Sequence, residues 1–129
     1  MASERFEDQR AQYLKALARL HEVLAEDETS IIRDALIKRF EFTFEMAWRS
    51  LFRYLVAKGE RVAQQAWAVL PLAFQSQLIS DARLWDQVRE YRNLISHTYD
   101  EAKAIEVAAF VRSSAIHTFD ALAERLRGL

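Results

Sequence analysis

Apolar residues recur at steps of three and four along four stretches of the chain, a spacing that predicts amphipathic helices. The predicted helices cover about residues 3–26, 30–58, 81–97 and 98–127. Ser3 is a favourable N-cap for the first helix, and Gly59 follows the second, where a left-handed backbone ends many helices. The sequence Thr98-Tyr99-Asp100-Glu101 has the form of a capping box, which is expected to open the last helix.

The connection between the second and third predicted helices, residues 59–81, has the weakest periodicity. Pro71 biases Leu70 away from helical backbone angles, so we expect a loop with one or two short helical pieces. Together the segments predict an all-α fold, an antiparallel up-and-down four-helix bundle with an extra short helix in the 59–81 connection. Because 129 residues are close to the length of one average domain, residues 1–129 are expected to form a single helical domain.

The composition supports a helical protein and limits the chemistry and the cellular location that we expect for it. Two Gly and one Pro are too few turn residues for an all-β fold, and the absence of Cys excludes disulfides, thiolate catalysis and Cys-ligated zinc. The N-terminus lacks the apolar core of a signal peptide and no apolar run reaches the ~18 residues of a membrane span, so we expect a cytoplasmic protein. A net charge of −1 gives no bulk attraction to nucleic acid or membranes, so any RNA contact needs a local patch.

The second predicted helix carries an unusual density of aromatic residues. Five apolar residues share one helical stripe and are expected to form core: Phe40, Phe44, Trp48, Leu51 and Leu55. Phe42 and Met46 fall about 160–240° from that stripe, so we expect them to face away from the bundle's own core. A homodimer or partner interface is the preferred explanation, and an exposed or loop-covered pair is the alternative.

Familiar catalytic and metal-binding patterns are missing from the sequence. Of the three His, His21 and His117 are interpreted as structural, and neither His-x3-His nor Glu-x-x-His spacing occurs, so neither a metal site nor a cofactor is expected. Gly59 and Gly128 are the only glycines, which excludes Gly-rich phosphate loops and the nucleotide-binding folds that depend on them.

Polar chemistry concentrates between Arg89 and Asp100, at the end of the third predicted helix. Arg92, Asn93, His97 and Tyr99 are residue types that bind a phosphate, position a sugar and move a proton near neutral pH. The alternative is structural, since cations favour helix C-termini and helix corners gather polar groups. On a continuous helix Arg92 and His97 would lie about 140° apart, so either the helix unwinds near Ser96 or both residues line a cleft against another body.

The sequence from Arg92 to Tyr99 resembles the Arg-x4-His-x-Tyr motif of HEPN-domain toxins, the partners of minimal nucleotidyltransferase (MNT) antitoxins. The stretches 39–48 and 92–101 are similar to the HEPN subgroup called nucleotidyltransferase substrate-binding proteins, and the resemblance covers essentially the whole chain. It implies a helical homodimer that cuts RNA without a metal ion and pairs with an MNT antitoxin, as in type VII toxin–antitoxin systems. Neither a membrane nor DNA is an expected partner.

The resemblance also implies roles for individual residues. Arg92 would stabilise the charge of the transition state, His97 would act as general acid or base, and Asn93 would orient the phosphate or the His. Tyr99 matches the tyrosine that the partner nucleotidyltransferase adenylylates. Two alternatives remain open: a non-catalytic subunit that binds substrate for a separate nucleotidyltransferase, and a purely structural dimerisation bundle.

Overall fold

The computed structural model describes residues 3–97 and 100–129, and within them every regular element is helical. In chain order these elements are α1 (Glu4–Leu24), α2 (Ser30–Ala57), α3 (Ala66–Gln75), α4 (Ala82–Leu94), the 3₁₀ helix η1 (Ile95–His97), α5 (Glu101–Phe110), the π-helical turn η2 (Val111–Ala115) and α6 (Ile116–Arg127). None of the described helices is long and apolar enough to cross a bilayer.

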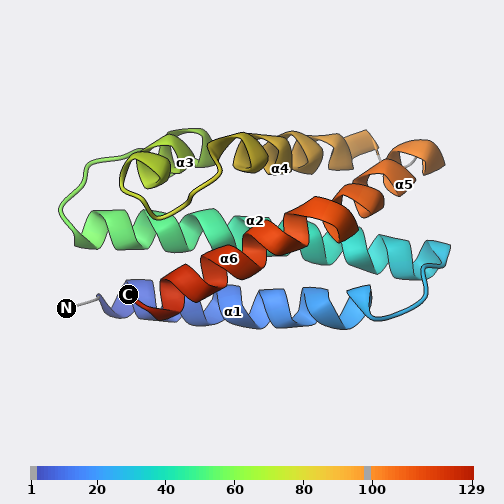
Figure 1. Cartoon of the computed structure of the whole chain (residues 1–129), viewed down its shortest axis with the longest axis horizontal. Coiled ribbons are helices and arrows are strands. Elements are labelled where there is room, and N and C mark those ends of the chain that lie inside the picture. Colours follow the sequence, from blue (N-terminus) through green and yellow to red (C-terminus); the bar gives the residue numbers. More distant parts are fainter. Residues whose placement is uncertain (1–2, 98–99) are drawn as a thin grey trace.

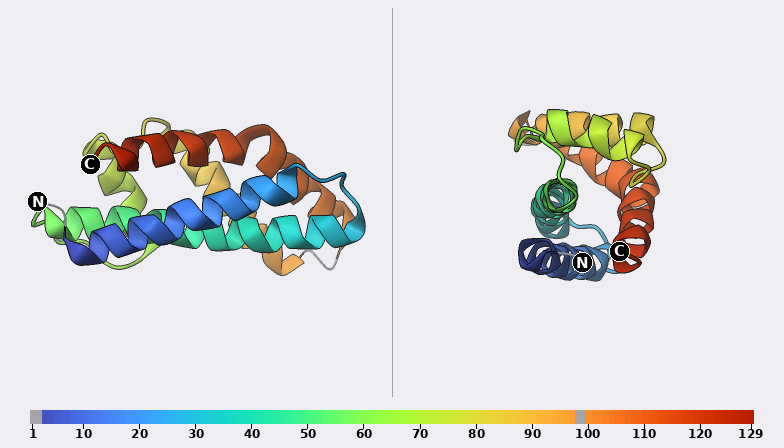
Figure 2. Two further views of the ribbon diagram at one scale, coloured as in Figure 1. Left: turned by 90° about the horizontal axis from the view of Figure 1, so that it is seen from below. Right: turned by 90° about the vertical axis from the view of Figure 1, so that its left-hand side faces the viewer.

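The helices form the predicted up-and-down bundle (Figure 1). Helices α1 and α2 run antiparallel, α3 and α4 return along the other side of α2, and the α5–η2–α6 helix runs back diagonally. Seen end-on, α2 lies between α1 and the α3–α4 layer, with α5 and α6 along a third side (Figure 2). The all-α bundle and its extra short helix are therefore confirmed.

The predicted ends of the first two helices are set by local chemistry. The Ser3 hydroxyl accepts a hydrogen bond from the Phe6 N–H at 3.0 Å, and the Thr29 hydroxyl accepts one from the Ile32 N–H at 3.1 Å. Gly59 has a φ of +90°, a left-handed backbone that is accessible to glycine at little cost. The predicted N-cap at Ser3 and the stop before Gly59 are confirmed.

Two local predictions are wrong. Pro71 lies inside α3, so Leu70 is helical, and the burial of Val69, Leu70 and Ala73 offsets the strain that a proline adds. The last helix is capped by Asp100, whose Oδ1 accepts hydrogen bonds from the N–H groups of Ala102 and Lys103. A capping box with Thr98 as N-cap is therefore incorrect, while Thr98 itself lies outside the described residues.

The central position of α2 explains one correct and one incorrect prediction on this helix. Phe42 is 52% exposed, as its position off the core stripe predicts. Met46 is only 7% exposed, and its Sδ lies 3.1 Å from Gln9 Nε2 on α1, so the prediction that it faces away from the core is wrong. Since α1 packs along α2 beside the main stripe, it covers Met46 almost completely but leaves half of Phe42 exposed.

The turn between α1 and α2 is tied through Glu28 to η2, a segment near the other end of the chain. Its two carboxylate oxygens accept hydrogen bonds from Arg33 Nε and Arg112 Nε, each at 2.9 Å. Arg112 follows Val111 in η2 and also donates to the Leu24 carbonyl at 3.0 Å. One carboxylate thus links three segments: the α1–α2 turn, the start of α2 and, 84 residues away in sequence, η2.

Candidate functional site

A pocket of about 500 Å³ opens between α2, the start of α3 and the C-terminal half of α4, and two of the predicted site residues, Arg92 and Asn93, line it. Its lining residues are Phe44, Glu45, Trp48, Arg49, Gln64, Gln65, Ala66, Trp67, Arg89, Arg92 and Asn93. Three arginines and one glutamate give the lining a net positive charge, although the whole chain carries −1. Arg49, Arg89 and Arg92 thus form a local basic patch at this pocket, and His97 is not part of it.

Arg92 is held across the pocket rim by two carboxylates of α2. Its Nη2 lies 3.4 Å from Glu41 Oε2, and its Nε lies 3.7 Å from Glu45 Oε1. Glu41 and Glu45 are one helical turn apart, so they present a pair of acceptors to the fork of one guanidinium. This arrangement fixes the side chain of Arg92 and compensates part of its charge.

The other two arginines differ in their surroundings. Arg49 Nε lies 3.7 Å from Glu45 Oε2, and Arg49 Cζ lies over the Trp48 ring, 5.4 Å from its centroid. Arg89 lies one turn before Arg92 on the same face of α4, and in the described part of the chain it has no carboxylate within ion-pair distance. The charge of Arg89 is therefore the least compensated in the pocket.

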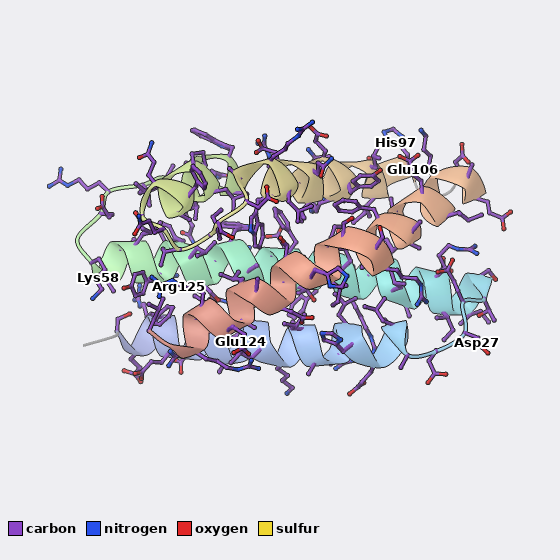
Figure 3. All side chains as sticks on the ribbon, in the orientation of Figure 1. Asp27, Lys58, His97, Glu106, Glu124 and Arg125 are labelled. Atoms are coloured by element: carbon purple, nitrogen blue, oxygen red, sulfur yellow. The ribbon has the colours of Figure 1, made fainter. Side chains whose placement is uncertain are left out.

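His97 lies beyond this pocket, at the end of η1. Helix α4 ends at Leu94 and tightens into the 3₁₀ turn, so the chain does leave the α-helical path near Ser96. His97 is exposed, its carbonyl accepts a hydrogen bond from the Asp100 N–H at 3.1 Å, and Figure 3 places it near Glu106 where α4 gives way to α5. The pocket thus joins Arg92 to Asn93 but not to His97, and Tyr99 lies outside the described residues.

An aromatic stack fixes the end of α4 that carries these residues. The rings of Tyr91 and Phe110 are nearly parallel, with centroids 4.0 Å apart, so α4 is packed onto α5 directly beside Arg92. Burial raises the pKa of the Tyr91 hydroxyl, and the Glu106 carboxylate raises it further. Tyr91 therefore stays neutral at physiological pH and acts as a packing residue.

Sequence reasoning missed several residues of the pocket. The sequence predicts Trp48 as core only, yet it also lines the pocket, and Gln64, Gln65 and Trp67 come from the weakly patterned connection. The only sequence signal for Trp67 is a large aromatic residue that follows the glutamines at 64 and 65 after one alanine. The described residues 3–97 and 100–129 contain no group of three or more His, Cys, Asp or Glu arranged to hold a metal ion.

Comparison with known proteins agrees with the resemblance noted in the sequence. A Haemophilus influenzae protein named probable ribonuclease HepT is 32% identical over 108 residues, which cover 78% of this chain and 73% of that protein. A Thermus thermophilus protein of known crystal structure has a TM-score of 0.72 at 36% identity, covering 90% of this chain and 96% of that one.

A second solved structure, from Haemophilus influenzae, is described as revealing the fold of a substrate binding domain of a nucleotidyltransferase. It has a TM-score of 0.66 at 26% identity, and the match covers 95% of this chain and 98% of that one. A family model described as nucleotidyltransferase substrate binding protein like matches residues 8–128. This match over nearly the whole chain shows that the protein belongs to the nucleotidyltransferase substrate binding protein-like family.

Proposed function

We propose that this protein is a metal-independent endoribonuclease of the HEPN type, the toxin of a type VII-like pair with a nucleotidyltransferase antitoxin. The pocket in which Arg92 and Asn93 lie beside two further arginines carries the proposal, because guanidinium groups suit a phosphodiester. The 32% identity to a protein named probable ribonuclease HepT supports the activity. The family description supports a nucleotidyltransferase as the partner.

In the proposed reaction the RNA strand supplies its own nucleophile. The 2′-oxygen attacks the adjacent phosphorus, the bond from phosphorus to the 5′-oxygen breaks, the 2′-hydroxyl loses its proton and the 5′-oxygen gains one. His97 acts as general acid or base because imidazole changes its charge near neutral pH. Arg92 stabilises the additional negative charge of the phosphorane-like transition state, and Asn93 orients the phosphate.

A second copy of the chain completes this site, since Arg92 and His97 do not share one pocket in a single protomer. Phe42, Glu45 and Arg49 follow one another at steps of three and four on α2, so they lie along one face of the helix. Phe42 is exposed there, while Glu45 and Arg49 line the pocket. A homodimer built on the Phe42 face would bring two pockets, each with its own Arg92, to one interface.

Adenylylation of Tyr99 by the partner is the proposed control. The tyrosine oxygen attacks the α-phosphorus of ATP, pyrophosphate leaves, and the hydroxyl proton is lost to solvent. Tyr99 follows His97 by two residues, so the added AMP would bring at least one negative charge next to the basic residues. The adduct would compete with RNA phosphate for Arg92 and occupy the space that RNA needs.

The second candidate function is a non-catalytic subunit that holds substrate for a separate nucleotidyltransferase. The pocket volume of about 500 Å³ favours it, because that volume suits one nucleotide. The solved structure described as a substrate binding domain of a nucleotidyltransferase is a further reason to keep it.

Cleavage of a labelled RNA in EDTA distinguishes the two functions. His97→Ala is expected to reduce the rate by roughly 10²–10⁴-fold with unchanged helical circular dichroism, because a general acid-base group contributes that much. His117→Ala removes an exposed His from α6 and serves as the matched control, with the rate of the parent protein. Equal cleavage by the parent protein and His97→Ala would indicate a contaminating nuclease and leave the substrate-binding function.

A further inference from the structure

The pocket beside Arg92 has an aromatic wall as well as a basic one. Trp48 is 7% exposed and its ring is fixed beneath Arg49, whereas Trp67 is 62% exposed at the start of α3. An indole ring that projects into water at the mouth of a pocket leaves a large apolar face without a partner. Bases of single-stranded nucleic acid stack on faces of this kind, whatever the base.

The basic and polar groups of the pocket are arranged for the remaining parts of a nucleotide. Arg89 and Arg92 project from one face of α4, and Arg89 has no ion-pair partner among the described residues. Gln64 and Gln65 add amides that donate and accept hydrogen bonds on the other side. Aromatic faces, amides and guanidinium groups thus line one cavity of about 500 Å³, large enough for one nucleotide.

We propose that this pocket is a subsite for a single unpaired nucleotide of the RNA strand, with the base stacked on Trp67 and its phosphate bound by Arg89 and Arg92. This inference rests on the proposed ribonuclease function. The subsite requires that the bound nucleotide be unpaired, because only an unpaired base reaches an aromatic face inside a pocket. The protein should therefore bind single-stranded RNA and discriminate against a duplex.

The test measures binding apart from cleavage. Fluorescence anisotropy of a labelled eight-nucleotide single-stranded RNA is followed in the His97→Ala background. Trp67→Ala is expected to weaken binding by about 5- to 150-fold, the range of a lost base–aromatic stack, while Trp67→Phe keeps most of the affinity. Arg89→Ala should also weaken binding and reduce the slope of log K against log salt by about 0.7.

Phe74→Ala provides the matched control, since Phe74 is also an exposed aromatic residue of α3 but does not line this pocket. It is expected to bind RNA as the His97→Ala parent does. A duplex of the same sequence should bind with no dependence on Trp67. Equal affinity of the Trp67→Ala variant and its parent for the single strand would overturn the subsite.

A free nucleotide has the same chemistry as one residue of an RNA strand, so AMP is titrated in parallel. The subsite is supported if RNA binding depends on Trp67 and if AMP competes with RNA for the parent protein but not for Trp67→Ala. Trp67-dependent binding of AMP without such binding of RNA overturns it. Trp67-dependent RNA binding by a parent protein that cuts no RNA would keep the subsite and reject the proposed nuclease.

Discussion

Arg92 on α4 faces Glu41 on α2, with 3.4 Å between Nη2 and the Oε2 of the carboxylate. Glu45 is the second carboxylate beside Arg92, with its Oε1 3.7 Å from Arg92 Nε. In the proposed function an RNA phosphate would therefore compete with two carboxylates for one guanidinium. The two carboxylates restrain Arg92 and at the same time weaken its attraction for an anion.

Glu41→Gln is expected to tighten the binding of single-stranded RNA by a few-fold at low salt. The substitution removes one negative charge beside Arg92 and keeps the shape of the side chain. Because the freed guanidinium then neutralises phosphate more completely, the slope of log K against log salt should become steeper by up to ~0.7. Salt titrations of binding in the His97→Ala background measure both quantities.

Glu124→Gln is the control for this charge change. Glu124 pairs with Arg127 on the exposed side of α6, away from the pocket, and its loss should leave both affinity and slope as they are. The same increase in affinity in both variants would mean that overall charge, and not the Arg92 pair, controls binding.

Phe42→Asp and Met46→Lys are expected to separate oligomerisation from stability. Phe42→Asp should give a folded monomer at tens of micromolar with little change in the stability of the protomer, because the ring is half exposed. Met46→Lys should lower the free energy of unfolding by about 2–4 kcal/mol, because it places a charge in the core. Sedimentation velocity and urea titration measure the two effects.

The control for the interface is Phe74→Asp, which places the same charge on an exposed aromatic residue of α3 and should leave the dimer intact. A parent protein that sediments as a monomer at the same concentration would remove the basis for an interface at Phe42.

Hydrophobic periodicity predicted the helices well where one helix has one buried face. Phe6, Leu17 and Leu20 of α1 are buried as their spacing predicts. The rule failed on α2 because this helix has neighbours on several sides, so Met46 is covered by α1 although it lies off the main stripe. Which sides of a central helix are covered depends on the packing of the other helices, and the periodicity of the central helix alone does not show it.

The candidate site was predictable only where its residues are close in sequence. Arg92 and Asn93 were identified from a cluster of polar residues on one helix, and they share a pocket. Glu41 and Trp67 are distant from that cluster, and the path of the chain between α2 and α4 brings them to it. The pocket is a product of tertiary packing, so its aromatic wall had no local sequence signal.

Glu28 is expected to make the stability of the fold depend on pH in the acidic range. Burial raises its pKa, but the hydrogen bonds and charges of Arg33 and Arg112 outweigh burial and lower the pKa below its ordinary value. The carboxylate therefore contributes its full stabilisation above the pKa of the unfolded chain and loses it as the pH falls through the lower folded pKa. Urea titrations from pH 7 to pH 3 should show this loss.

Glu28→Gln should lower the free energy of unfolding at pH 7 by about 1.5–3 kcal/mol, the range of hydrogen bonds to a charged group, and flatten its dependence on pH below 5. Glu60→Gln removes an exposed carboxylate from the connection after α2 and should change neither quantity. A Glu28→Gln variant as stable as the parent would show that the three segments do not depend on this carboxylate.

Tyr99→Phe is expected to keep ribonuclease activity but to escape inactivation by the partner nucleotidyltransferase. The substitution removes the only atom of the side chain that accepts AMP and leaves Arg92 and His97 in place. Incubation with the partner, ATP and Mg²⁺ should add one or more AMP units to the parent protein, abolish its RNA cleavage and leave Tyr99→Phe unmodified and active. Tyr91→Phe is the matched control, because Tyr91 is stacked against Phe110 and should not be a target of modification. Intact-mass spectra before and after incubation decide the matter: no gain on the parent, or the same gain on Tyr99→Phe, would refute Tyr99 as the modified residue.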